Sequence, residues 1–402
     1  MSMHDYKITT IPNPGPWNVP AKTISMFTGV AAIGAILWGI GLAMDPLRGW
    51  SAYIINFCFV FFFALSGVVF TAIQYMTSAQ WSPAIRRIPE GMTAFLPLGI
   101  LFIALYWFGV PKLYEWSDTW TNFHGLSSEV HRTKTTWLSQ PFFTVRQIIF
   151  AAIWLLFATL MVKNSLKQDK ENAPQLSKVN TKLSIAFIIF FALSFSVASY
   201  DWLMSLEPTW FSTMFGVYTF TGLFQSGIAV IAIFAILMRR SGALPITKSG
   251  HIRDLGGFIF GMSTFMSYIG FSQYMLIWYA NLPEETFYFM KRSQEGWWII
   301  FVLLPLLKFV IPFAFLLSAD AKRNEKVLLF VAGCVIAGQW LDLYWMVLPA
   351  HYAKLTLPGI ADVGGLLFFS GLFIVMTLRF YKKHSVLPVG DPGILKSLNW
   401  GA

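Results

Sequence analysis

The side chains best able to do chemistry in this chain are carboxylates that lie where long apolar runs meet or end. The stretch SYDWLMSLEPTWFS (199–212) carries two of them and has no lysine or arginine of its own. Groups in such places can accept or pass protons, and burying one without a partner in a membrane is costly. The candidates for such chemistry are Arg146, Asp201, Glu207, Glu284, Glu285, Asp342 and His351.

The acids also have structural interpretations. Asp201 can mark a solvated helix end, Glu207 can cap the next helix, and the adjacent Glu284 and Glu285 can belong to a solvated connection. For Asp342, which lies inside an apolar run, we favour pairing or function over exposure to lipid, because an unpaired carboxylate is expensive there.

Arg146 is a cation that could complete this group. It lies about one turn inside an apolar run, in QPFFTVRQIIF. One alternative is that its long side chain reaches back to the lipid headgroups. The other is that it pairs with Asp201, Glu207 or Asp342, which would explain why these acids have no cation nearby in the sequence.

Lys308 is the most isolated charge, about 12 residues or ~18 Å into its apolar run and so near the middle of a bilayer. A lysine at this depth usually faces the interior of a helix bundle. It is a candidate for a step in a proton path, and the alternative is a structural partner for backbone carbonyls near Pro305 and Pro312. Polar side chains that could share such a path are Gln225, Ser267 and Tyr268.

The composition is that of a polytopic membrane protein. The 402 residues are 56% hydrophobic and only 12% charged, about half the charge of a soluble domain. A bilayer span needs ~20 apolar residues, and several charge-free runs are longer. We predict an all-α fold with ten transmembrane helices at residues 24–44, 53–77, 92–110, 142–162, 181–204, 210–238, 255–280, 296–318, 327–349 and 363–380.

The distribution of lysine and arginine sets the expected orientation. Most of them lie in the two tails, residues 1–23 and 381–402, and in the even-numbered connections between helices. By the positive-inside rule both termini are cytoplasmic. The acidic stretch 199–212 then lies at the outer face. The net charge of +10 is explained by this topology, and we expect lipid contacts and no nucleic-acid partner.

The cysteines and histidines argue against a redox centre in this chain. Cys58 and Cys334 lie far apart in apolar runs, with no pattern of iron–sulfur ligands. Haem within a bilayer is commonly held by histidines inside the helices, and all six histidines lie in tails or connections. We therefore expect no metal, haem or iron–sulfur cluster bound by this chain.

Two stretches carry a family resemblance. SYDWLMSLEPTWFSTMFGVYTFTGLFQSGIA (199–229) and MLIWYANLPEETFYFMKR (275–292) resemble the polysulfide-reductase membrane-subunit family, also called NrfD-like. Within it the chain looks most like the shorter of the two such subunits of bacterial alternative complex III, a quinol:cytochrome c oxidoreductase. The two motifs are specific, and the remaining helices resemble the family mainly in pattern.

The resemblance implies an arrangement and a set of partners. It implies two four-helix bundles, at 53–204 and 210–349, with the helices at 24–44 and 363–380 peripheral. It also implies a complex in the bacterial cytoplasmic membrane with a longer NrfD-like paralogue, an iron–sulfur subunit, c-type haem subunits and, as a further partner, a terminal oxidase. The substrate would be menaquinol or ubiquinol, oxidised near the outer face.

Three functions remain open at this point. The first is a subunit that supplies a quinol site, a proton path or both to a respiratory quinol-oxidising complex. The second is a secondary transporter, which would also place ionisable residues in the membrane. The third is a structural anchor for the complex. Since the family implies two paralogous membrane subunits, the sequence also leaves open which of the two holds the quinol.

Overall fold

The computed structural model describes residues 10–117, 134–171 and 173–400. Within these ranges the protein is all-α, with no strand and ten helical segments long and apolar enough to cross a membrane. The spans are α1 (Ala21–Met44), α2 (Pro46–Met76), Ser82–Phe108, α7 (Gln140–Glu171), α8 (Gln175–Trp202), α9 (Phe215–Arg240), α10 (Ser249–Ala280), Trp298–Phe315, α15 (Glu325–Val347) and α16 (Ile360–Lys383). The predicted fold class is confirmed. Residues 1–9 of the predicted N-terminal tail and 401–402 of the C-terminal tail lie outside the described ranges.

Two of the spans are interrupted, and short elements join the others. The third span consists of η1 (Ser82–Ile85), α3 (Arg87–Met92), η2 (Thr93–Phe95), α4 (Leu96–Leu105) and η3 (Tyr106–Phe108). The eighth consists of α12 (Trp298–Pro305), the π-helical turn η7 (Leu306–Val310) and α13 (Ile311–Phe315). The connecting elements are α5 (Val110–Leu113), η4 (Glu115–Ser117), η6 (Met204–Leu206), α11 (Pro283–Ser293), α14 (Ala319–Arg323), η8 (Leu348–Ala350) and α17 (Ile394–Leu398).

The predicted helix ends differ from the observed ones where a local signal was overlooked. The second span starts at Pro46 instead of residue 53, because Asp45 caps it by accepting a hydrogen bond from the Arg48 amide at 3.0 Å. The sixth starts at Phe215 instead of residue 210. The segment between Leu206 and Phe215 forms a turn, in which the Trp210 amide donates to the Glu207 carbonyl.

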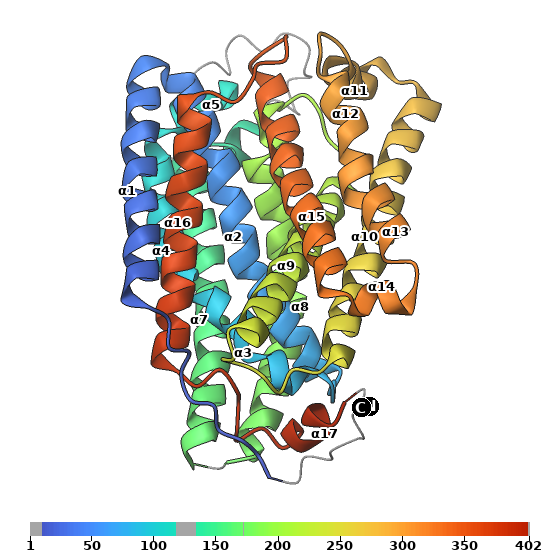
Figure 1. The fold of residues 1–402 in the computed structure, drawn as a ribbon. Helices are drawn as coiled ribbons and strands as arrows, with labels where there is room; N and C mark the ends of the chain where they lie inside the picture. Colours follow the sequence, from blue (N-terminus) through green and yellow to red (C-terminus); the bar gives the residue numbers. More distant parts are fainter. Residues whose placement is uncertain (1–9, 118–133, 172, 401–402) are drawn as a thin grey trace.

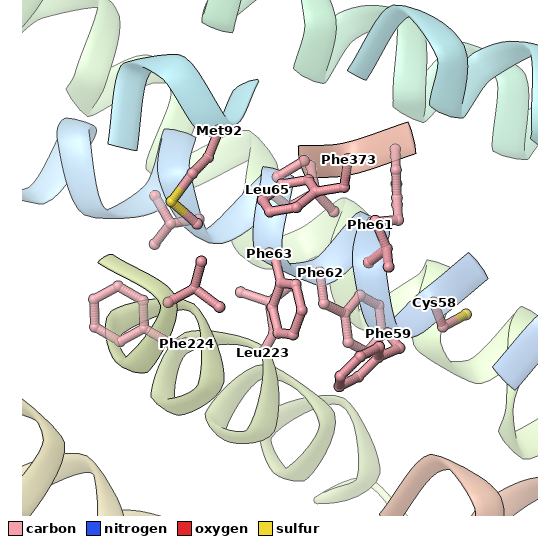
Figure 2. Close-up of a cluster of buried hydrophobic side chains, with 14 of the residues drawn as sticks. Cys58, Phe59, Phe61, Phe62, Phe63, Leu65, Met92, Leu223, Phe224 and Phe373 are labelled. Atoms are coloured by element: carbon pink, nitrogen blue, oxygen red, sulfur yellow. The ribbon is translucent and has the colours of Figure 1, made fainter. Parts of the chain in front are cut away.

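Helix α2 forms the centre of the molecule (Figure 1) and its apolar stretch is completely buried. It contacts α8 and α9 as well as α15 and α16. Figure 2 shows part of the resulting core, where Phe62 and Phe63 of α2 lie among Leu223 and Phe224 of α9, Met92 of α3 and Phe373 of α16. A helix that is apolar on every side is typical of a buried helix or a membrane span, and here the neighbours of α2 surround it.

Helices α1 and α16 pack side by side at one edge of the molecule (Figure 1). Glycines make this contact close, because a Cβ on Gly34 would overlap the backbone nitrogen of Phe368. Small residues in this role are typical of membrane helix pairs. The division into two bundles stays a prediction, because α2 packs against helices of both proposed halves.

Candidate functional site

Arg146 pairs with Asp201, which is one of its three predicted partners. The guanidinium of Arg146 on α7 makes two 2.8 Å hydrogen bonds to the Asp201 carboxylate on α8. Gln147 also donates to Asp201, and the Trp137 indole does so at 3.3 Å. Both charged side chains are buried. The carboxylate at this helix end, disfavoured by the helix dipole, is therefore compensated by a cation from another helix.

Glu207 pairs instead with Arg292, at 2.8 Å. Lys291 lies further away, with its Nζ 3.7 Å from the same carboxylate oxygen. The Arg292 guanidinium lies 3.5 Å from the centre of the Tyr288 ring, and Tyr288 stacks on Trp210 with ring centres 3.8 Å apart. Helix α11 thus closes over the turn that carries Glu207.

Asp342 pairs with Lys308, the lysine predicted to lie deep in the membrane. The Lys308 Nζ lies 2.6 Å from Asp342 Oδ2 and donates to Gln339 Oε1 at 2.8 Å. The other carboxylate oxygen, Oδ1, accepts a 2.7 Å hydrogen bond from the Tyr218 hydroxyl. All four side chains come from three spans: α9, the Trp298–Phe315 segment and α15.

The helix around Lys308 is interrupted, and Gln225 compensates for the interruption. Pro312 has no N–H to donate to the Lys308 carbonyl, which an α-helix would require. The π turn η7 lies at this point, and Gln225 Nε2 donates to the Lys308 carbonyl at 2.7 Å and to Ser263 at 2.8 Å. The lysine side chain is therefore not needed for the free carbonyl and points to Asp342.

A cavity of about 240 Å³ lies beside this cluster. Its walls are mainly aromatic and include Lys308 and Tyr218. They also include Tyr288, whose ring faces the Arg292 guanidinium. The remaining lining comes from Phe215, Met266, Ser267, Gly270, Phe271, Gln273, Tyr274, Phe289, Phe301, Leu304, Pro305, Phe309 and Trp345. The cavity is thus next to both ion pairs. It reaches the Lys308–Asp342 pair through Lys308 and Tyr218, and the Glu207–Arg292 pair through Tyr288. Arg146 and Asp201 do not line it.

Two predicted members of the proton path separate in the structure. Ser267 lines the cavity, but its neighbour Tyr268 is 65% exposed and does not line it. Successive residues of a helix lie ~100° apart, so α10 turns Tyr268 to the outside. The proton path itself stays a prediction. Of its proposed members, Gln225 contacts Lys308 directly, because its side-chain amide donates to the Lys308 backbone carbonyl.

The remaining candidates lie at the end of the bundle near α11. Glu284 is exposed and Glu285 half-buried in the first turn of α11, and neither lines the cavity. His351 is half-buried, and its Nε2 has no hydrogen-bond partner among the described residues. Burial and the positive charges of Lys291 and Arg292 lower the pKa of His351 to about 4, so it is neutral at pH 7.

Sequence reasoning missed Arg292, Tyr218, Gln339 and Tyr288. Arg292 lies in one of the family-like motifs, in the connection that was interpreted as solvated at Glu284 and Glu285. It is in fact 1% exposed. The amphipathic pattern of α11 was the available signal, because it predicts one side of that helix to be covered.

Within residues 10–117, 134–171 and 173–400, no group of three or more His, Cys, Asp or Glu side chains is arranged to hold a metal ion. No protein-family model matches the chain, and no curated protein is found to match it.

Proposed function

We propose that this chain is an integral membrane subunit of a respiratory quinol-oxidising complex in the bacterial cytoplasmic membrane, and that its aromatic cavity takes the quinol head group. The main observation behind the proposal is that Tyr218 and Lys308 line this cavity and that both are hydrogen-bonded to Asp342. The resemblance of 199–229 and 275–292 to NrfD-like subunits supports the same function, since these stretches contribute Tyr218, Tyr288 and Phe289 to the cavity wall.

The size and walls of the cavity suit a small ring system. Its volume of about 240 Å³ is close to the lower end of ligand pockets, ~300–1,000 Å³. Aromatic side chains stack favourably on a flat ring. Phe271 and Pro305 line the cavity and are also exposed. A lipid-soluble substrate could therefore enter from the bilayer between α10 and α12.

The cluster offers a route for a quinol proton. The hydroxyl of the quinol would give its proton to the Tyr218 oxygen as Tyr218 gives its own to Asp342 Oδ1, 2.7 Å away. Lys308 would stabilise the negative charge that develops on the ring oxygen and hold the carboxylate in place. Oxidation releases two protons and two electrons, and both electrons would pass to an iron–sulfur subunit of the complex.

The polar groups near α11 would carry the protons onward. Tyr288 lies between the cavity and the Glu207–Arg292 pair. Burial raises the pKa of Tyr288 to about 12, so in this route its hydroxyl would accept one proton while it donates its own and would not become a phenolate. Glu207 and His351 would complete the exit to the face of the membrane predicted to be outside.

The first experiment is a mild-detergent purification through a tag on this chain. We expect c-type haem in the reduced-minus-oxidised spectrum, an iron–sulfur protein and a longer paralogue among the co-purifying subunits, and quinol-dependent reduction of a high-potential acceptor. A colourless protein without partners would contradict the proposal.

A secondary transporter is the second candidate. The interrupted helix at Lys308 favours it, because transporters often place their sites at breaks in membrane helices. This candidate predicts that the isolated chain catalyses uptake of a substrate into liposomes, driven by a proton gradient, and that Lys308→Met abolishes the uptake. The quinol proposal predicts no such activity.

A further inference from the structure

A second groove lies on the opposite half of the molecule from α11, and nothing proposed above uses it. This groove is open to one side and has a volume of about 550 Å³. Its floor is the backbone of α10 at Gly257 and Gly261, where a Cβ would meet nothing within 4 Å. Trp81 and Phe258 form an apolar wall, with ring centres 5.7 Å apart. The floor and this wall form an apolar channel.

Charged residues stand at the end of this channel. Arg253 pairs with Asp254 at 2.9 Å, and the other oxygen of Asp254 accepts a 2.6 Å hydrogen bond from the Trp400 indole. Lys322 of α14 lines the groove with its Nζ 4.5 Å from the centre of the Phe260 ring. No acid pairs with Lys322 among the residues that the structure describes, so the groove carries net positive charge.

We infer that this groove binds an anionic phospholipid. The phosphate would lie between Lys322 and the remaining donors of Arg253, and an acyl chain would lie along the backbone at Gly257 and Gly261. Basic pockets between membrane helices bind acidic lipid headgroups in this way. The even-numbered connections that supply these cations are the ones predicted to be cytoplasmic, so the lipid belongs to the inner leaflet.

The positive charge of the groove favours an anionic lipid over a zwitterionic one. A phosphatidylglycerol headgroup is negative and complements the unpaired lysine, whereas phosphatidylcholine brings its own cation and no net charge. A lipid also fits the shape, because it needs an open channel beside a charge and not a closed pocket. This inference is independent of the quinol proposal.

The test is native mass spectrometry of the purified protein with its co-purifying partners, after titration with phosphatidylglycerol or phosphatidylcholine. We expect retention of phosphatidylglycerol on the wild type. Lys322→Gln should weaken this retention about fivefold, the effect of one basic side chain near a membrane surface. Gly261→Phe should weaken it by filling the channel, and neither variant should affect phosphatidylcholine.

Two matched variants serve as controls. Gly39→Phe adds the same ring at another exposed, open glycine on α1, and Lys112→Gln removes an exposed lysine far along the chain. Both should keep wild-type retention. Equal retention of the two lipids, or equal loss in the controls, would overturn the inference. A photoreactive methionine analogue at position 262, where the native Met262 already lines the groove, should crosslink to lipid, and crosslinking to a protein subunit alone would also overturn the inference.

Discussion

Lys308 Nζ and Asp342 Oδ2 lie 2.6 Å apart, on different spans and with both side chains almost fully buried. Each residue alone would be expensive in a bilayer, and together they form a pair that Tyr218 and Gln339 complete. Lys308 lines the aromatic cavity, as does Tyr218, which donates to Asp342. This relationship is the basis of the first prediction.

Replacing Asp342 with asparagine should slow quinol oxidation by the complex at least about 100-fold, because general acid–base groups commonly contribute 10²–10⁴ in rate. The measurement is the initial rate with a soluble quinol, normalised to haem content. Glu284→Gln is the control, since Glu284 is exposed and does not line the cavity. A wild-type rate in the Asp342 variant would remove the residue from the mechanism.

Gln225→Leu should destabilise the chain by ~1 kcal/mol, because the Lys308 carbonyl loses its donor beside Pro312. Thermal unfolding in detergent measures this effect. Gln294→Leu, at an exposed position, should leave the unfolding temperature unchanged. If the two variants unfold alike, Gln225 does not support the interrupted helix.

Arg146→Gln should destabilise the chain by ~3–5 kcal/mol, since it leaves Asp201 buried without its cation. The double variant with Asp201→Asn should recover part of that loss. Because neither residue lines the cavity, quinol oxidation per folded complex should stay at the wild-type level. A slower rate in the folded double variant would place this pair in the proton route after all.

The stability of the wild type should fall as the pH drops from about 6.5 to about 4. His351 stays neutral in the fold because its pKa is lowered to about 4. Below its ordinary pKa, ~6.5, the unfolded chain binds the proton and the folded chain does not, so protonation favours unfolding. In His351→Gln the decline of the unfolding temperature over this interval should be shallower. If the unfolding temperature of His351→Gln changes with pH as that of the wild type does, His351 does not titrate as described.

The sequence predicted the spans well, because long apolar runs and the charges between them are local signals. It also predicted that the acids need distant cations, and Arg146 was correctly considered for Asp201. It could not identify Arg292 for Glu207 or Lys308 for Asp342, because these pairs join residues brought together only by the packing of helices. For the same reason Ser267 and Tyr268 were treated alike, although the ~100° between successive residues of α10 places Ser267 at the cavity and Tyr268 at the outer surface.

The most direct test of the central claim is photolabelling of the purified complex with a photoreactive quinone, followed by mass-spectrometric mapping of the labelled peptides. The account predicts label on α10, α11 and α12 around the cavity, displaced by excess quinol. It also predicts loss of this label in Gly270→Leu, whose side chain would enter the cavity beside Tyr218. Label found only on another subunit, unchanged in that variant, would contradict the assignment of the quinol site to this chain.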